Sequence, residues 1–157
     1  MAETPGTKAL RAQGVDFTLH PYDYDPRADA VGLAAAQALG LEPALTLKTL
    51  MVEVDGKPAC CVIPSGRQLS MKRVAAAFGG KAAAMMPPAK AEKLTGYRVG
   101  GISPFGAKRP APVCIEAAAC AAPRVWINAG QRGLLLGIAP ADALRVAEAR
   151  AVALVAD

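Results

Sequence analysis

Histidine and aromatic residues are scarce in this sequence. His20 is the single histidine, and Phe, Trp and Tyr make up 4% of the 157 residues. A serine-hydrolase triad needs a nucleophile, a base and an orienting acid, so His20 alone would have to supply the usual base. No Gly-x-Ser-x-Gly or Gly-x-Gly-x-x-Gly motif occurs, and Gly79-Gly80-Lys81 lacks the upstream glycine of a Walker loop. The sequence therefore disfavours triad hydrolysis, hydride transfer and nucleotide hydrolysis, and a structural role suits His20 better.

Cysteine pairs with the spacing of a metal site are also missing. Cys60 and Cys61 are adjacent, and Cys114 and Cys120 are separated by five residues, so neither pair is a Cys-x-x-Cys motif. With one histidine in the chain, a zinc site would need an unusual mixture of ligands. We expect buried, reduced thiols and neither a metal nor another cofactor.

Long apolar runs are absent as well. Hydrophobic residues make up 53% of the chain, but 35 of the 157 residues are alanine. The stretch 113–122 is interrupted by Glu116 and is shorter than the roughly 20 residues of a membrane span. The N-terminus has no apolar core after its first charges, so it does not resemble a secretory signal. We expect a cytoplasmic protein without membrane contact.

Positive charge is in excess. The 18 Lys and Arg residues outnumber the 13 Asp and Glu residues, which gives a net charge of +5 and a pI of about 9.2. Such a surplus suits a polyanionic partner, although an ordinary solvated surface gives the same balance.

The pattern of helix and strand signals predicts one α/β domain over residues 1–157. Asp55-Gly56 lies between two β-branched and apolar runs and predicts a type I′ hairpin turn. Caps, Pro and Gly mark the ends of the other elements. The expected helices are 4–14, 29–39, 70–78, 87–95 and 140–149, and the expected strands are 15–20, 45–54, 57–63, 97–99, 113–116, 125–128 and 134–138.

Two features offer places for chemistry. The segment Gly100-Gly101-Ile102-Ser103-Pro104 follows the expected strand 97–99 and has no side chain at two adjacent positions. Its N–H groups form either a cradle for an oxyanion or phosphate or simply a tight turn. Lys48 lies in an otherwise apolar strand, where it is either an outward-facing residue or a donor to a phosphate or carbonyl oxygen.

Several motifs resemble the YbaK/prolyl-tRNA synthetase editing-domain superfamily, and most of all its freestanding Cys-tRNA(Pro) deacylases. The resemblance extends over about residues 4–155. The motifs that carry it are Pro21-Tyr22, Leu47-Lys48-Thr49-Leu50, Thr95-Gly96-Tyr97, Gly100-Gly101-Ile102-Ser103-Pro104 and Gln131-Arg132-Gly133-Leu134.

The resemblance implies a single compact α/β domain with a central mixed, partly barrel-like sheet flanked by helices. It implies hydrolysis of cysteine mischarged onto tRNA(Pro), and possible action on Cys-tRNA(Cys), with the substrate thiol attacking its own ester. Two other readings stay open, namely a deacylase for another small residue such as Ala-tRNA(Pro), and a non-catalytic tRNA-binding module.

The resemblance also implies the site residues. Lys48, Gly100 and Gly101 are the expected catalytic group. Val31 departs from the family pattern, because related deacylases often have phenylalanine there, and Leu135 stands where some relatives have aspartate. The expected substrate-binding residues are Tyr22, Val31, Thr49, Ile102, Ser103, Pro104 and Leu135.

The implied partners are aminoacyl-tRNA, in particular tRNA(Pro), and prolyl-tRNA synthetase, but not DNA. Phosphate contacts would use the surplus of basic side chains without reading a base sequence. The candidates near the expected site in the sequence are Lys72, Arg73, Lys81, Lys90, Lys93, Lys108 and Arg109.

Overall fold

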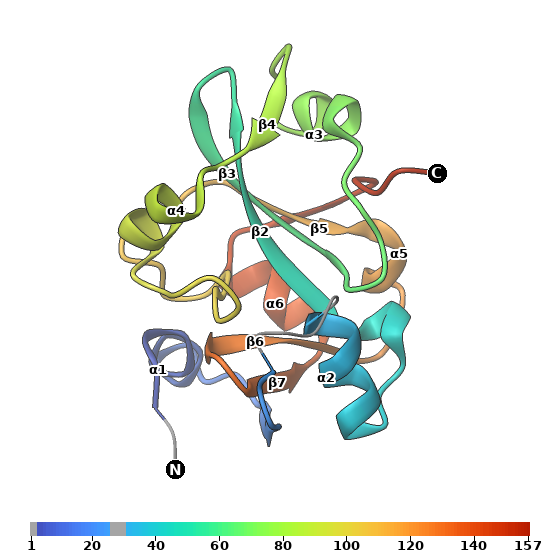
Figure 1. The fold of residues 1–157 in the computed structure, drawn as a ribbon. Coiled ribbons are helices and arrows are strands. Elements are labelled where there is room, and N and C mark those ends of the chain that lie inside the picture. Colours follow the sequence, from blue (N-terminus) through green and yellow to red (C-terminus); the bar gives the residue numbers. More distant parts are fainter. Residues whose placement is uncertain (1–2, 26–30) are drawn as a thin grey trace.

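The computed structural model describes residues 3–25 and 31–157 (Figure 1). Helices and strands alternate along the chain, as the sequence predicts. In order they are α1 (Pro5–Ala12), β1 (Thr18–Pro21), α2 (Val31–Leu39), the 3₁₀ helix η1 (Pro43–Leu45), β2 (Leu47–Val54), β3 (Lys57–Pro64), α3 (Met71–Ala77), β4 (Ala83–Met85), α4 (Pro88–Thr95), β5 (Val113–Glu116), α5 (Ala117–Cys120), β6 (Val125–Gln131), β7 (Leu134–Ile138), α6 (Pro140–Val146) and β8 (Arg150–Val152).

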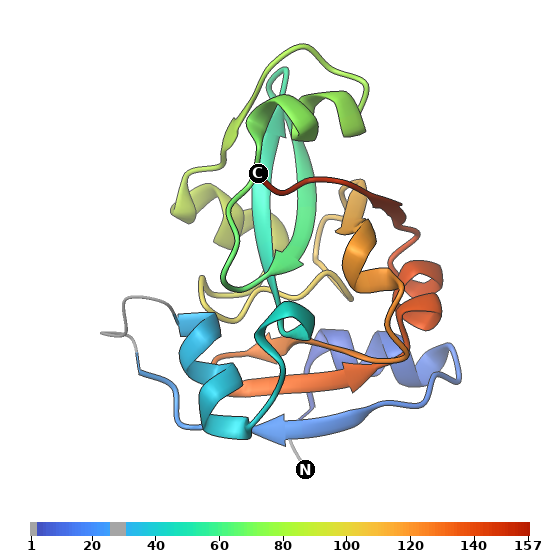
Figure 2. The ribbon, with the colours of Figure 1, turned by 90° about the vertical axis from the view of Figure 1, so that its right-hand side faces the viewer.

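The strands form two sheets. A five-stranded sheet has the order β4-β2-β3-β5-β8, in which β3, β5 and β8 run parallel and the other pairs are antiparallel. A three-stranded antiparallel sheet has the order β1-β7-β6. Figure 2 shows the smaller sheet running crosswise beneath β2 and β3, and a parallel bridge from Thr46 to Trp126 joins the two sheets. The expected mixed α/β fold is therefore confirmed, and its sheet is not closed into a barrel.

Strand alternation builds two apolar cores. Cys60 and Val62 of β3 belong to the core between the two sheets, whereas Cys61 and Ile63 belong to the core under α3 and the C-terminal segment. This is the pattern expected of a strand whose successive side chains point to opposite faces. Three of the four cysteines are buried and Cys120 is half-buried, and none forms a disulfide.

The predicted hairpin is confirmed. Asp55 and Gly56 have φ values of +50° and +81°, the positive values that a type I′ turn requires. The carboxylate of Asp55 also accepts hydrogen bonds from the Lys81 and Ala82 amides, which places Lys81 at the tip of the hairpin.

The prediction of a strand at 97–99 is wrong, because Tyr97 lies in a bend, Arg98 has no regular structure and Val99 lies in a turn. The short strands β4 and β8 and the helix α5 were not expected; each is three or four residues long and has no pattern of its own. The first strand begins later than expected and includes Pro21, which an edge strand such as β1 tolerates. The expected start of the second helix at Asp29 lies outside the described residues.

Among the described helices, none combines the length and the hydropathy of a membrane span.

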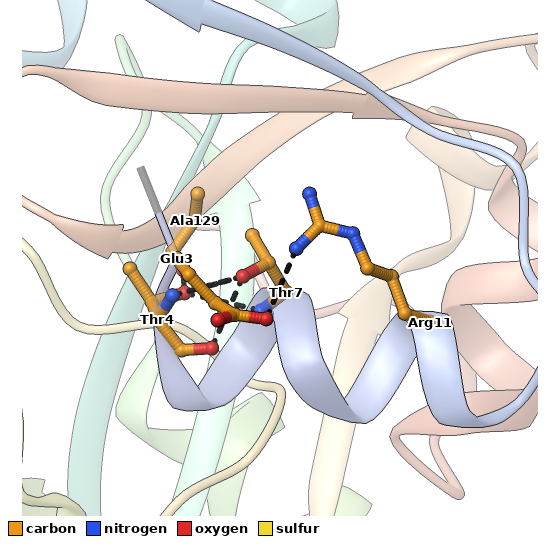
Figure 3. Close-up of polar contacts among 5 residues, drawn as sticks. All are labelled: Glu3, Thr4, Thr7, Arg11 and Ala129. Atoms are coloured by element: carbon orange, nitrogen blue, oxygen red, sulfur yellow. Dashed lines mark hydrogen bonds and ion pairs between the residues drawn. The ribbon is translucent and has the colours of Figure 1, made fainter. Parts of the chain in front are cut away.

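Helix α1 begins with a capping box that also ties the helix to β6 (Figure 3). The Thr7 amide donates to Thr4 Oγ1 at 3.1 Å, and the Thr4 amide donates to Thr7 Oγ1 at 2.9 Å. The Thr4 hydroxyl donates in turn to the carbonyl oxygen of Ala129. An ion pair between Glu3 and Arg11, 3.3 Å apart, adds a contact along the exposed side of the helix.

The Thr95-Gly96-Tyr97 motif fastens the loop that follows α4. The Thr95 hydroxyl donates to Ala91 O at 2.8 Å and accepts from the Tyr97 amide at 3.1 Å. The buried Tyr97 hydroxyl donates to Phe105 O at 2.6 Å, and burial raises its pKa to about 12. The motif therefore fixes both ends of the segment 97–105, which contains the glycine pair.

We expect Tyr97→Phe to lower the free energy of unfolding by about 1–3 kcal/mol, because the buried Phe105 carbonyl loses its donor. Chemical denaturation measures the change. Tyr24→Phe is the matched control, since the Tyr24 hydroxyl donates to no acceptor among residues 3–25 and 31–157. Equal stability of the two variants would contradict the structural role of the Tyr97 hydroxyl.

Candidate functional site

A cavity of about 520 Å³ lies along the first half of β2. Its walls come from α2, from the segment after β3, from the β4–α4 connection, from the glycine loop and from β6 and β7. The lining residues are Tyr22, Leu33, Ala35, Thr46, Leu47, Lys48, Thr49, Leu50, Met51, Ser65, Gly66, Arg67, Gln68, Met85, Met86, Pro88, Ala91, Val99, Gly100, Ile102, Asn128 and Leu135.

The cavity borders an open edge of β2. Strand β4 pairs only with Val52–Val54, and the Met86 amide donates to Met51 O at 3.1 Å. The two-residue hairpin makes Val54 and Lys57 a hydrogen-bonded pair, so the pairing with β3 alternates and Thr49 directs its N–H and C=O away from β3. The Thr49 hydroxyl oxygen is also buried and has no hydrogen-bond partner among the described residues. The backbone N–H and C=O of Thr49 therefore have no partner among the described residues at this edge of the strand.

Lys48 is half-buried and lines the same cavity as Gly100. Its side chain follows the alternation that places Leu50 and Val52 on one face of β2, and Thr49 lies on the other face. The cavity follows the edge of the strand, so residues of both faces line it. Burial lowers the pKa of the Lys48 ammonium, which indicates a group partly withdrawn from water.

Asn128 braces the glycine loop against β6. Its side-chain Nδ2 donates to Gly100 O at 3.1 Å, and its Oδ1 accepts from the amides of Gly130 and Gln131 at 2.7 and 3.2 Å. The β6–β7 register shifts between Asn128 and Gln131, so this side chain satisfies amides in an irregular part of the strand. Gly100 has a φ of +91° and lies against the Tyr24 ring, and a Cβ atom there would approach the Tyr24 hydroxyl to 2.6 Å.

Val99, the residue before Gly100, is also fixed by hydrogen bonds. The Val99 amide donates to a Glu92 carboxylate oxygen at 2.9 Å. The Val99 carbonyl accepts from Arg132 Nε at 2.9 Å, and the Arg132 guanidinium lies 5.2 Å from the centre of the Tyr24 ring. The loop therefore holds its shape through contacts to α4 and to the β6–β7 turn.

Gly101 has a structural role in this loop and does not line the cavity. Its amide donates to Arg98 O at 2.8 Å, and a Cβ atom would lie 2.8 Å from the Arg132 nitrogen. The amides of Gly100 and Ile102, in contrast, donate to no acceptor among residues 3–25 and 31–157.

The other expected site residues divide into three groups. Tyr22, Thr49, Ile102 and Leu135 line the cavity. Ser103 and Pro104 instead line a second cavity of about 190 Å³, whose lining also includes Arg109 and Glu148. Val31 begins α2, but its side chain lies outside the described residues.

Tyr22 joins the cavity from the end of β1. Its amide donates to Gly133 O at 2.9 Å, which extends the pairing of β1 with β7 by one residue. Burial raises the pKa of the Tyr22 hydroxyl, so this hydroxyl is a neutral donor at ordinary pH.

His20 does not line the cavity. Its Nε2 lies 2.7 Å from the Thr18 hydroxyl, and its ring makes an edge contact with Trp126 at 6.5 Å. Burial and the nearby Arg124 guanidinium lower the pKa of His20. The contacts are those of the structural histidine that the sequence favours.

Sequence reasoning missed the wall formed by the segment after β3. Ser65 is buried, and its hydroxyl donates to Thr46 O at 2.6 Å. Arg67 donates to Ala156 O at 2.9 Å. Pro64-Ser65-Gly66 directly after an apolar strand is a turn signal, but a turn signal alone gives no indication of a cavity. Asn128 and Leu33 were also missed, because only the packing of distant elements brings them to the site.

The charged side chains that line the cavity are all basic. They are Lys48 and Arg67, and the described lining includes no Asp or Glu. None of the basic residues expected to contact tRNA lines this cavity. Lys90 pairs with Glu53 at 2.5 Å, Arg73 contacts Asp157 at 2.8 Å, and Arg109 lines the second cavity. No cluster of three or more metal-ligating side chains occurs in the part of the chain that is described.

Comparisons with known proteins agree on one family. The family model described as "Aminoacyl-tRNA editing domain" matches residues 26–146. A curated protein of Enterococcus faecalis, named "Putative Cys-tRNA(Pro)/Cys-tRNA(Cys) deacylase EbsC", is 36% identical over 109 residues. This match covers 68% of the present chain and 66% of the relative, just under two thirds of its length.

Solved structures share the fold. One is described as "Crystal structure of a putative trans-editing enzyme for prolyl tRNA synthetase"; it has a TM-score of 0.79 and 22% identity, and the match covers 99% of this chain and 100% of that one. A second, described as a hypothetical protein, has a TM-score of 0.85 and 20% identity, with 98% and 100% coverage. At these identities the likeness concerns the fold.

We expect Asn128→Ala to destabilise the protein by about 1–3 kcal/mol, because it leaves the Gly100 carbonyl and the Gly130 amide without a partner. Chemical denaturation and amide hydrogen exchange measure the effect. Asn128→Asp is the matched control: it keeps the acceptor for the Gly130 and Gln131 amides and removes the donor to Gly100. Unchanged exchange at Gly130 in Asn128→Ala would contradict the bracing role.

Proposed function

This chain belongs to the aminoacyl-tRNA editing domain family, and from that membership we propose that it is an aminoacyl-tRNA deacylase that removes cysteine mischarged onto tRNA(Pro). The named activity of the Enterococcus faecalis relative supports this substrate. The observation that carries the proposal is the cavity at the open edge of β2, where Lys48, Thr49 and the Gly100 loop form one lining.

The polar groups of the cavity suit an ester carbonyl. Lys48 supplies an ammonium, and the amides of Gly100 and Ile102 supply donors that the described residues do not use. Donors held in place stabilise the negative charge that develops on a carbonyl oxygen under attack. Because an aminoacyl ester is already activated, orientation alone can contribute on the order of 7–11 kcal/mol to lowering the barrier. Such a site needs no histidine, and His20 lies outside it.

The substrate thiol acts as the nucleophile in the proposed reaction. The charged side chains of the described lining, Lys48 and Arg67, are positive, and positive charge favours the thiolate over the thiol. The sulfur bonds to the ester carbonyl carbon while the ester C–O bond breaks, and the thiol proton ends on the ribose oxygen. The tRNA leaves with a free hydroxyl, and cysteine leaves as a cyclic thioester that water then opens.

The substrate amine has neutral acceptors in this cavity. Leu135 occupies the position where some relatives have aspartate, and the described lining has no carboxylate. The Thr49 carbonyl at the strand edge is the group that accepts from the amine, because the Thr49 hydroxyl oxygen is buried. A site of this kind binds the unprotonated amine better than the ammonium, because Lys48 repels positive charge.

tRNA(Pro) and prolyl-tRNA synthetase are the proposed partners. The name of the relative contains tRNA(Pro), and the description of one structural neighbour contains prolyl tRNA synthetase. The chain acts as one editing domain over residues 1–157 and takes its choice of tRNA from that synthetase.

We expect Lys48→Ala to lower kcat/KM for Cys-tRNA(Pro) by about 100- to 1,000-fold, the usual effect of losing a donor to an oxyanion. His20→Ala is the control and keeps the activity, since His20 lies outside the cavity. Release of cysteine from tRNA charged with labelled cysteine measures both. Loss of activity in the histidine variant alone would falsify the assignment of Lys48.

S-Methylcysteinyl-tRNA(Pro) separates the thiol-assisted reaction from attack by water. Methylation removes the nucleophile and adds one methyl group, so we expect turnover to fall at least 100-fold relative to Cys-tRNA(Pro), on the order of an intramolecular advantage. Equal turnover of the two esters would contradict the thiol step and leave the deacylase standing. Faster turnover of Ala-tRNA(Pro) than of Cys-tRNA(Pro) would contradict the cysteine specificity.

A further inference from the structure

The second cavity lies where the loop after α4 meets the end of α6, and the proposed reaction makes no use of it. Its volume of about 190 Å³ compares with about 520 Å³ for the cavity along β2. Pockets for drug-sized ligands begin at roughly 300 Å³, so the second cavity suits a smaller molecule.

The interior of the second cavity is apolar and uncharged. Met51, Cys60 and Val113, from β2, β3 and β5, line it and are all buried. Burial raises the pKa of the Cys60 thiol, so this thiol stays neutral. Val146 at the end of α6 adds a further aliphatic contact. Such an interior suits a small aliphatic group.

One part of the lining offers positive charge and hydrogen-bond donors. The Arg109 side chain is exposed and forms no ion pair or hydrogen bond with any described residue. The amides of Gly106 and Ala107 donate to no acceptor in the described part of the chain. The Arg109 amide donates to Leu94 O at 2.9 Å, which holds this segment against α4. A guanidinium beside unused amides is chemistry that binds a carboxylate.

Another part of the lining carries a carboxylate in an uncommon conformation. Glu148 follows the end of α6 with a φ of +51°, the left-handed conformation that glycine usually adopts after a helix. A glutamate held there costs free energy, and residues in such conformations gather at ligand sites. Its side chain is exposed and has no ion-pair partner within the described ranges. This carboxylate suits an ammonium group.

We propose that the second cavity binds a free α-amino acid with a small aliphatic side chain. The amino acid carboxylate contacts Arg109 and the Ala107 amide, its ammonium contacts Glu148, and its side chain enters the apolar interior. A zwitterion matches a lining with both signs of charge, whereas the charged side chains in the described lining of the first cavity are both positive. This inference does not depend on the proposed deacylase activity.

The two cavities share a wall. Met51 lines both, and Ile102 lines the first cavity while Ser103 and Pro104 line the second. An amino acid in the second cavity therefore contacts the loop that bears the Ile102 amide, one of the proposed oxyanion donors.

L-Valine and two analogues that each lack one of its charges test the inference. Isovalerate lacks the amino group and isobutylamine lacks the carboxylate, and both keep the branched side chain. NMR titration of the full chain gives the affinity for each compound and the residues whose amides shift. We expect L-valine to bind about 5-fold more tightly than either analogue, the size of one partly exposed ion pair. The shifts should concentrate at Ala107, Val113 and Ala147, which line the second cavity.

Variants of the lining assign each contact. Arg109→Gln should remove the preference for L-valine over isobutylamine, and Glu148→Gln should remove the preference over isovalerate. Lys108→Gln is the matched control, because Lys108 is exposed and adjacent to Arg109 but does not line the cavity. Ala147→Leu keeps both charges and fills the cavity, so it should abolish binding.

Four results would overturn the inference. They are equal affinity for the three compounds, unchanged preferences in Arg109→Gln and Glu148→Gln, unchanged binding in Ala147→Leu, and shifts at Thr49 and Leu135 in place of the second cavity. The third result would reduce the contact to ion pairing at the surface, and the fourth would place the amino acid in the cavity along β2. None of these measurements depends on ester cleavage.

Discussion

The open edge of β2 is the constraint on which the site depends. A strand in the middle of a sheet has all its backbone groups paired, and such a strand could offer a ligand only side chains. Here β4 pairs with β2 from Val52 onward, and the bridge at Thr46 joins β2 to β6. Thr49 lies between the segment paired with β4 and the bridge to β6. The two sheets are joined at the Thr46–Trp126 bridge and separate beyond it. The cavity lies between them where they separate. A closed barrel would have removed it.

The glycine loop holds its shape because hydrogen bonds from three elements converge on it. Glu92 on α4, Asn128 on β6 and Arg132 in the β6–β7 turn bind consecutive backbone groups at Val99 and Gly100. The capping box of α1 adds a contact at Ala129, next to Asn128. A loop fixed in this way holds the Gly100 and Ile102 amides, which donate to no described residue, in place without reorganisation during the proposed reaction. Donors that need no reorganisation stabilise developing charge most effectively.

Local signals account for the parts of the fold that sequence reasoning found. The Asp55-Gly56 turn, the caps at Thr4 and Ser70 and the apolar strands are encoded by neighbouring residues. The strands β4 and β8 depend on partners far away in the sequence, and so does the cavity wall of Leu33 and Asn128. The two adjacent glycines look alike in the sequence, yet their roles differ. Gly100 lines the cavity, whereas Gly101 has no side chain to collide with the β6–β7 turn that packs against it. Only the packing distinguishes the two.

The sign of the charge in the cavity links the roles assigned to its residues. Lys48 and Arg67 both favour anions, and the proposed reaction brings three of them: the phosphodiester, the thiolate and the carbonyl oxygen under attack. An aspartate at position 135 would hold an ammonium, but it would also oppose each of these anions at short range. Leucine at this position therefore shifts the balance from binding the charged amine toward stabilising the transition state. Leucine in place of a carboxylate at position 135 is therefore compatible with the proposed catalysis. What it changes is how the substrate amine is recognised.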